Sequence, residues 1–230
     1  MDAGPRSVVF LCSGGGGNLR FLVEAMRLGM LPEFRLASVI TDRPCEAGAY
    51  ASRVGLDVFE LDLREAGQPQ LMAALQQHDP AVVVSNVHRI LCPQVVAAFG
   101  DRLVNLHYSL LPAFGGVIGA KPVEQALAYG ARLVGATVHR VSDQLDGGTP
   151  LAQVALPVRD GDTLPLLMDA VFRAGCVVLL EAIRRMHTTA IDMPRFGQPI
   201  RELAHRQVLF CPECADSSVF HDEGFWSRLK

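Results

Sequence analysis

The chain has 230 residues, half of them hydrophobic (50%), and its mean hydropathy is +0.24. Its 21 lysines and arginines nearly balance 24 aspartates and glutamates, which gives a formal net charge of −3 and an isoelectric point near 6.1. This composition excludes an intrinsically disordered chain and a nucleic-acid binder that works through a general basic surface.

The first part of the chain alternates between apolar runs and segments of helical period. Apolar, β-branched runs typical of buried strands cover residues 7–12, 36–41, 81–85, 103–106 and 133–138. Helical periodicity marks residues 18–29, 47–54, 69–77 and 93–99. Asn18 suits the N-cap of the first helix, and Gly29 suits its end. The alternation predicts an α/β fold, with a mostly parallel, Rossmann-like sheet, helices on both faces, and ligands at the carboxyl ends of the strands.

The pattern changes from about residue 133. Residues 133–141 and 150–157 are extended runs around a polar turn, and residues 163–185 form one long helix capped by Asp162 or Thr163. The remainder is polar but carries Phe220, Phe225 and Trp226, which indicates packing on the core or on a partner chain. We therefore expect a catalytic domain over residues 1–186 and a C-terminal extension over residues 187–230, with a homodimer left open.

The chain carries no pattern typical of export or of a membrane span. Residues 103–120 contain no charged side chain, but Asn105, His107, Pro112 and several glycines exclude a spanning helix there. A five-residue apolar run after Ser7 is too short for a signal peptide. These observations predict a cytoplasmic protein that binds neither membranes nor nucleic acid.

Six cysteines are scattered along the chain, which is typical of reduced intracellular proteins. Cys211 and Cys214 have the spacing of half a zinc site, but a full site needs four ligands. A redox pair and two ordinary cysteines in a turn are the alternatives. We expect no metal, with this pair as the less favoured zinc candidate.

A glycine run follows the first predicted strand and precedes the first predicted helix. Its backbone N–H groups and the helix N-terminus form a site suited to an anion. It is not a dinucleotide fingerprint, because Leu19 replaces the third glycine, and no Gly-Lys-Ser/Thr follows as in a P-loop. A plain tight turn is the alternative. The predicted substrate-binding residues are Gly14, Gly15, Gly16, Gly17 and Asn18.

Three polar residues are candidates for acid–base chemistry. Strand alternation places Asn105 and His107 on the same face at the end of a predicted strand. Asp146 precedes a double glycine, where an aspartate alone is most often a turn residue. Together the three supply an amide donor, an imidazole and a carboxylate, and we expect them to be the catalytic residues.

Over roughly residues 7–158 the sequence resembles the folate-dependent formyltransferase family and implies its fold. The segments beginning at His107 (His-Tyr-Ser-Leu-Leu-Pro) and running from Val138 to Asp146-Gly-Gly carry the resemblance. The glycine run and the stretch from His88 to Leu91 are similar to glycinamide ribonucleotide formyltransferases. The stretches at 119–122 and 135–139 are similar to formyltetrahydrofolate deformylases.

The resemblance implies the chemistry. The donor would be 10-formyltetrahydrofolate, and a small-molecule amine would attack its formyl group. Asn105 and His107 would stabilise the oxyanion, while Asp146 would hold the protonation state of His107 and relay the proton of the amine. The donor-binding residues would be Arg89, Ile90, Leu91, Val141, Ser142, Asp143 and Leu145.

Departures from the family pattern argue against glycinamide ribonucleotide as the acceptor. The loop after Pro112 is about three residues longer, Tyr108 replaces a proline, Gly17 replaces a serine, and Gly175-Cys176 replaces a Glu-His pair. A different amine, such as an amino sugar or a hydrazine-like nitrogen, would then be the substrate. A deformylase is the first alternative, disfavoured because no regulatory domain precedes the first strand. A folate-binding protein without catalysis is the second.

Overall fold

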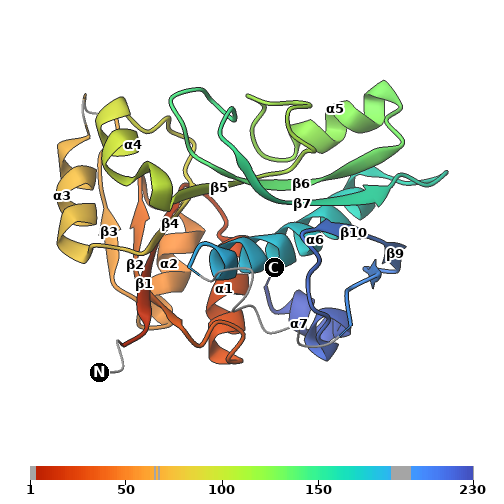
Figure 1. The fold of residues 1–230 in the computed structure, drawn as a ribbon, viewed down its shortest axis with the longest axis horizontal. Helices are drawn as coiled ribbons and strands as arrows, with labels where there is room; N and C mark the ends of the chain where they lie inside the picture. The colour runs from red at the N-terminus through yellow and green to blue at the C-terminus, as the bar shows by residue number, and fades with distance from the viewer. Residues whose placement is uncertain (1–3, 65, 67, 188–197, 230) are drawn as a thin grey trace. The chain divides into compact units, whose positions relative to one another are not determined.

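The structure, a computed structural model, describes residues 4–64, 66, 68–187 and 198–229 and divides into two compact units (Figure 1). The first unit comprises the described residues up to Asn105 together with Arg140–Asp143. The second comprises Leu106–His139 and the described residues from Gln144 onward. Each unit has its own sheet pairing and is described separately.

Parallel strands make up the sheet of the first unit. They are β1 (Arg6–Cys12), β2 (Phe34–Thr41), β3 (Val58–Glu60), β4 (Val82–Asn86) and β5 (Leu103–His107), in the order β5-β4-β1-β2-β3. The register aligns Val83 of β4 with Leu103 of β5, and Phe10 of β1 with Val39 of β2. Strand β3 is short and partly exposed, which is why the apolar pattern did not predict it.

Four helices accompany this sheet among the described residues: α1 (Gly17–Arg27), α2 (Glu46–Arg53), α3 (Pro69–His78) and α4 (Pro93–Phe99), the last followed by the 3₁₀ turn η1 (Gly100–Arg102). Residues from α3 and α4 form one buried cluster with one face of the strands, including Val9, Leu11 and Val83. Alternation directs Val8 and Phe10 to the opposite face, where α1 and α2 contact β2 (Figure 1).

The expected N-cap of α1 was wrong. Gly16, not Asn18, is the N-cap, and its φ of +77° is left-handed. A Cβ at Gly16 would lie 2.7 Å from the Cβ of Ala47, so the turn requires glycine. The helix therefore begins earlier, at Gly17, and Asn18 becomes a buried helical residue that accepts a hydrogen bond from Asn86 at 3.3 Å.

In the second unit, antiparallel strands pair with one another. They are β6 (Leu133–Arg140), β7 (Pro150–Pro157) and β10 (Leu209–Cys211), in the order β10-β7-β6. Helix α6 (Leu164–Arg185) contacts β7 and α5 (Lys121–Tyr129), and Thr163 is its N-cap. The rest of the unit contains the hairpin β8 (Glu202–Leu203) and β9 (Arg206–Gln207), the turn η2 (Ser218–His221) and α7 (Glu223–Ser227). In the described part of the chain, no helix combines the length and apolar character needed to cross a membrane.

The end of the chain packs into the second unit. Trp226 is fully buried, its indole N–H donates to the Phe220 carbonyl at 2.9 Å, and its ring meets that of Phe225 edge-on. Arg173 of α6 lies over the same indole and pairs with both carboxylate oxygens of Glu223 at 2.5 and 2.7 Å. Helix α7 is thus joined to α6 by apolar and charged contacts.

We predict that Trp226→Ala lowers the free energy of unfolding by about 3–5 kcal/mol, because it empties a large buried site and removes the cation–π contact with Arg173. Urea unfolding followed by circular dichroism measures the change. Trp226→Phe keeps an aromatic ring and should cost clearly less. A loss below about 0.5 kcal/mol for the alanine variant, typical of surface positions, would contradict the packing described.

Candidate active site

Asp146 lies between two buried histidines in the second unit. Its Oδ2 is 3.4 Å from Nδ1 of His107, at the end of β5, and its Oδ1 is 3.5 Å from Nε2 of His139, near the end of β6. The Gly116 N–H donates to Oδ2 at 2.7 Å. The carboxylate is therefore contacted by two strand histidines and by one loop N–H group. The Asp146 side chain is only 11% exposed.

The surroundings of Asp146 act on its pKa in opposite directions. Burial disfavours the carboxylate and acts to raise the pKa. The hydrogen bonds from His139 and from the Gly116 N–H, followed by the charge interactions with His107 and His139, outweigh burial and hold the pKa of Asp146 below its ordinary value. Asp146 is therefore ionised at neutral pH.

His107 has an oxygen acceptor at each ring nitrogen. Nδ1 faces Asp146, and Nε2 lies 3.1 Å from the carbonyl oxygen of Phe114. A carbonyl oxygen can only accept, so Nε2 is the donor in this contact. Phe114 has a φ of +58°, a conformation that non-glycine residues rarely adopt, and it brings its carbonyl to the histidine.

The loop after His107 is fixed by polar contacts to β6. The Thr137 hydroxyl donates to the Ser109 carbonyl at 2.7 Å and accepts from the Leu111 N–H at 3.1 Å. Gly135 allows the close approach, because a Cβ there would lie 1.9 Å from the Val154 carbonyl oxygen and 2.8 Å from Cδ2 of Leu110. The strand β6 therefore holds the loop by which Phe114 reaches His107.

Asn105 lies two residues before His107 on β5, in the first unit. Its amide N–H donates to the Ser85 carbonyl of β4 at 2.5 Å, which fixes the side chain on the sheet. The expected catalytic residues are thus placed as follows: His107 and Asp146 are in contact, and Asn105 is anchored at the carboxyl end of the same strand as His107.

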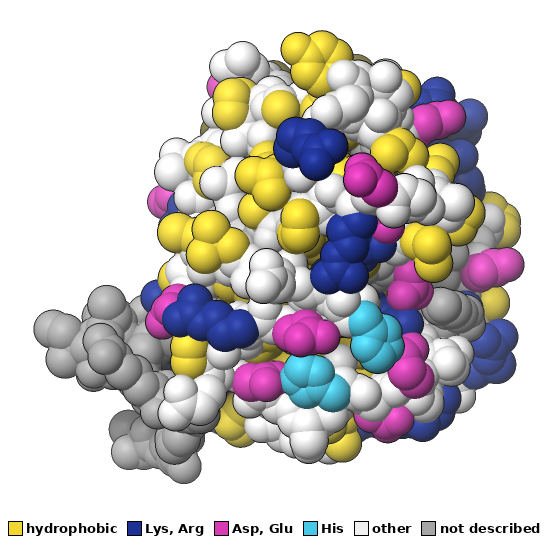
Figure 2. Space-filling model, turned by 90° about the vertical axis from the view of Figure 1, so that its right-hand side faces the viewer, with side chains coloured by type: hydrophobic (Ala, Val, Ile, Leu, Met, Phe, Trp, Pro, Cys, Tyr) yellow, Lys and Arg dark blue, Asp and Glu magenta, His cyan; other side chains and the backbone are white. Residues whose placement is uncertain are grey.

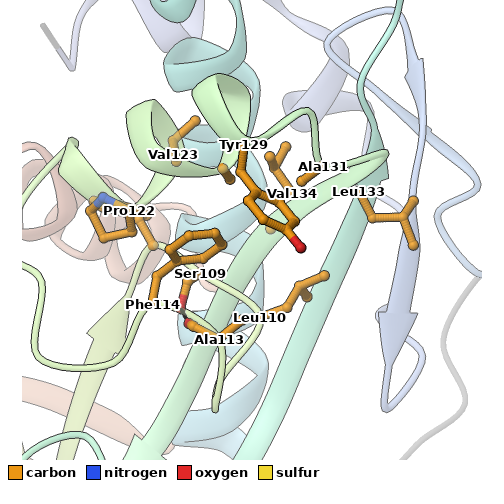
Figure 3. A pocket seen from close by; sticks show the side chains of 13 residues that line it. Ser109, Leu110, Ala113, Phe114, Pro122, Val123, Tyr129, Ala131, Leu133 and Val134 are labelled. Carbon is orange, nitrogen blue, oxygen red and sulfur yellow. Dashed lines mark hydrogen bonds between the residues drawn. The ribbon is translucent and has the colours of Figure 1, made fainter.

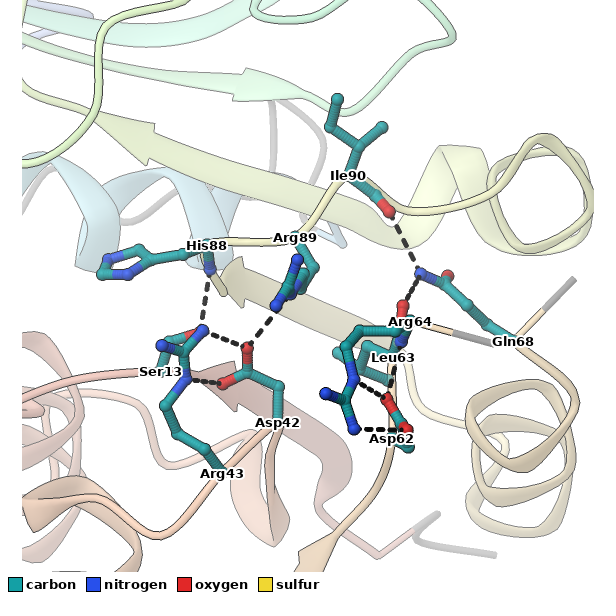
Figure 4. Close-up of polar contacts among 10 residues, drawn as sticks. All are labelled: Ser13, Asp42, Arg43, Asp62, Leu63, Arg64, Gln68, His88, Arg89 and Ile90. Atoms are coloured by element: carbon teal, nitrogen blue, oxygen red, sulfur yellow. Dashed lines mark hydrogen bonds and ion pairs between the residues drawn. The ribbon is translucent and has the colours of Figure 1, made fainter. Parts of the chain in front are cut away.

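The predicted donor-binding stretch is a turn between β4 and α4, also in the first unit. The His88 N–H donates to the Ser13 hydroxyl oxygen at 2.8 Å, which ties the turn to the start of the glycine run (Figure 4). Arg89 lies 3.8 Å from Asp42, which also pairs with Arg43 at 2.7 Å. Burial acts to raise the pKa of Asp42, but the hydrogen bonds from Arg43 and Ser13 outweigh it and lower that pKa.

The remaining predicted binding residues differ in exposure: Asn18 is buried, whereas the others are half-buried or exposed. The glycine run leads into α1. The Ala47 N–H of α2 donates to the Gly14 carbonyl oxygen at 3.1 Å, which ties the run to α2. Val141 is held by its N–H to the Leu103 carbonyl at 3.0 Å, and Ser142 and Asp143 follow it in the first unit. Leu145, in the second unit, is largely exposed.

An apolar cavity of about 270 Å³ lies beside the loop after β5. Figure 3 shows the Phe114 and Tyr129 rings facing it, with Pro122 and Val123 of α5 alongside. All its lining side chains are uncharged. Phe114 therefore belongs to both features, since its ring lines the cavity and its carbonyl contacts His107.

The described residues contain no group of three or more His, Cys, Asp and Glu side chains placed to hold a metal ion. Cys211 is exposed, whereas Cys214 is buried, and burial raises the pKa of its thiol. On the face drawn in Figure 2, basic and acidic side chains are interspersed and hydrophobic ones gather above them, so neither sign of charge dominates there.

Sequence reasoning missed His139, Phe114 and Gly116 as neighbours of His107 and Asp146. His139 had a signal: it lies on a buried strand, two residues from the inward-facing Thr137 and seven before Asp146. Phe114 and Gly116 act through backbone groups, and no side-chain pattern identifies such contacts.

Comparisons with known proteins identify the family of this chain. The formyl transferase family model matches residues 6–183. Over 195 residues the chain is 37% identical to the phosphoribosylglycinamide formyltransferase of Mycobacterium tuberculosis, a match that covers 82% of this chain and 88% of that protein. A stretch of 108 residues, 46% of this chain, is 38% identical to the formyltetrahydrofolate deformylase of Escherichia coli O6:H1 and covers 38% of it.

Among solved structures, glycinamide ribonucleotide transformylase 1 from Symbiobacterium toebii matches with a TM-score of 0.72 and 32% identity, over 78% of this chain and 86% of that one. This likeness confirms the predicted α/β formyltransferase fold. Because the family model and the mycobacterial relative each match most of the chain, the protein belongs to the formyl transferase family of folate-dependent enzymes.

Proposed function

We propose that the protein transfers a formyl group from 10-formyltetrahydrofolate to a primary amine. The observation that carries the proposal is the buried contact of Asp146 with His107, two residues after Asn105 on the strand β5. Family membership supports the type of reaction. The turn at Arg89, Ile90 and Leu91, with the segment 141–145, would hold the donor, and the glycine run would hold the acceptor.

The proposed reaction begins when the amine nitrogen attacks the formyl carbon. A new C–N bond forms, and the carbonyl oxygen becomes an oxyanion. The Asn105 amide donates a hydrogen bond to this oxyanion, and His107 stabilises it when its Nε2–H exchanges the Phe114 carbonyl for the oxyanion. The C–N bond to the folate then breaks, the amine loses a proton and the folate nitrogen gains one, with Asp146 relaying it. The ionised state of Asp146 and the two acceptors around His107 suit these roles.

The acceptor expectation is revised. The sequence departures argued against glycinamide ribonucleotide, but that exclusion is not borne out by the comparisons, because the matching proteins are named for this substrate. Two of the departures are also linked by packing: a Cβ at Gly175 would lie 3.0 Å from Cε1 of Tyr108. A tyrosine at one position thus favours a glycine at the other. Glycinamide ribonucleotide is therefore the first amine to test.

Hydrolysis is the second candidate, favoured by the match to a deformylase over 108 residues. Incubating the purified chain with 10-formyltetrahydrofolate, with and without glycinamide ribonucleotide, separates the two reactions. A transferase gives tetrahydrofolate and a formylated amine in equal amounts only when an acceptor is present. Rapid formate release that no amine diverts would overturn the proposal.

We predict that Asn105→Ala lowers kcat by about 10²–10³, the usual cost of removing an oxyanion donor. Rapid-mixing assays at saturating substrates measure kcat. Asn86→Ala is the matched control, because it removes a part-buried asparagine at the end of the neighbouring strand β4, whose amide donates to the Asn18 side chain. Equal effects of the two substitutions would contradict the proposed role of Asn105.

A second prediction concerns the pH dependence. The lowered pKa of Asp146 means that its carboxylate contributes stability above the pKa of the unfolded chain, and that this contribution is lost as pH falls through the folded pKa. His139→Leu removes a hydrogen bond and a positive neighbour, so the pKa of Asp146 rises and the acidic limb of kcat/KM moves to higher pH. NMR titration of the carboxyl carbon measures the pKa directly.

His139→Gln is the control, because it keeps a donor near Asp146 and should shift the acidic limb less. An unchanged Asp146 pKa in a folded His139→Leu protein would refute the coupling. Circular dichroism establishes that both variants are folded.

A further inference from the structure

A buried amide side chain joins two loops of the first unit. Gln68, the residue before α3, is 4% exposed. Its Nε2 donates to the carbonyl oxygens of Leu63 and Ile90, each at 3.0 Å (Figure 4). Its Oε1 accepts from the Cys92 N–H at 3.0 Å. One side chain therefore fixes the loop between β3 and α3 to the turn between β4 and α4.

The orientation of this amide follows from its partners. Two carbonyl oxygens need two N–H donors, and one N–H needs an acceptor, so a flipped amide would place oxygen against oxygen and N–H against N–H. The backbone of Gln68 has a φ of +44°, a region that costs energy for a non-glycine residue. The three buried hydrogen bonds of its side chain hold Gln68 in this conformation.

The turn that Gln68 holds presents a large apolar side chain to solvent. The Ile90 carbonyl is bound inward by Gln68, and the Ile90 residue is 72% exposed. At the other end of the turn, the His88 N–H is bound by the Ser13 hydroxyl. Both ends are thus fixed before any ligand arrives, which lowers the entropy that a ligand must overcome on binding.

We propose that Gln68 is a positioning residue for the formyl donor: it acts through the backbone of Ile90 and Cys92 to preorganise the surface on which the folate ring binds. The inference rests on the proposed function, since that function assigns the turn to the donor. Gln68 is not among the donor-binding residues that the resemblance implies. Its proposed effect on the donor is indirect, through the backbone of the turn.

Two substitutions separate the contacts. Gln68→Met keeps an unbranched side chain of similar length and removes all three hydrogen bonds. Gln68→Glu keeps the acceptor for the Cys92 N–H but replaces the two donors by an oxygen that repels the Leu63 and Ile90 carbonyls. Gln76→Glu and Gln76→Met are the matched controls, because Gln76 is an exposed residue of α3, the helix that follows Gln68.

We expect both Gln68 variants to raise the donor KM at least about tenfold, as for the loss of buried hydrogen bonds, and to leave the acceptor KM and the kcat at saturating donor within about twofold. The Gln76 controls should change none of these constants. Isothermal titration with tetrahydrofolate, which needs no turnover, should give a matching rise in Kd. Amide hydrogen exchange at Cys92 should quicken in Gln68→Met and stay slow in Gln68→Glu.

The outcomes distinguish the two proposals. If the wild-type chain binds tetrahydrofolate and a folded Gln68→Glu protein binds it equally well, the role of Gln68 is refuted and the proposed function stands. A fall in kcat and thermal stability with an unchanged donor KM would also refute it, because a purely structural role predicts that pattern. If the wild-type chain binds no folate and transfers no formyl group, the proposed function fails and the inference falls with it.

Discussion

A carboxylate that is largely removed from water must be compensated, and Asp146 is compensated from three directions. His107 comes from β5, His139 from β6, and the Gly116 N–H from the loop before α5. An unpaired charge at such a site would cost several kcal/mol. The course of each of these segments is therefore constrained by the carboxylate. The same three contacts keep Asp146 ionised at neutral pH.

Side-chain contacts to the backbone fix the loops of both units. In the second unit, the Thr137 hydroxyl holds Ser109 and Leu111 in the loop after β5. In the first, Ser13 and Gln68 hold the turn after β4. Each loop follows the carboxyl end of a strand in its own unit, but a few buried polar groups determine its shape. Rigid loops on a sheet are what a site needs when its reacting groups must stay in place.

The sequence predicted the regular elements well because their signals are local. The run 150–157 is β7 with the same bounds, and the helix expected from residue 163 is α6, beginning at Leu164. It did not predict the start of α1, because the contact of Gly16 with Ala47 is a tertiary constraint. The contact of His107 with Asp146 was predictable from the resemblance and from residue chemistry. The packing of His139 and the anchoring by Gln68 were not, since both depend on segments distant in sequence.

The charge of Arg173 in α6 connects the body of the second unit with the end of the chain. Its side chain is 7% exposed, and burial acts to lower its pKa, but Glu223 and Asp169 outweigh burial and raise it. Without α7, this guanidinium would lose Glu223 and the face of Trp226. Helix α7 and the position of Arg173 in α6 are therefore energetically coupled. A relative that lacks α7 is expected to carry a smaller or uncharged residue in place of Arg173. The residue at this position of α6 would then indicate whether α7 is present.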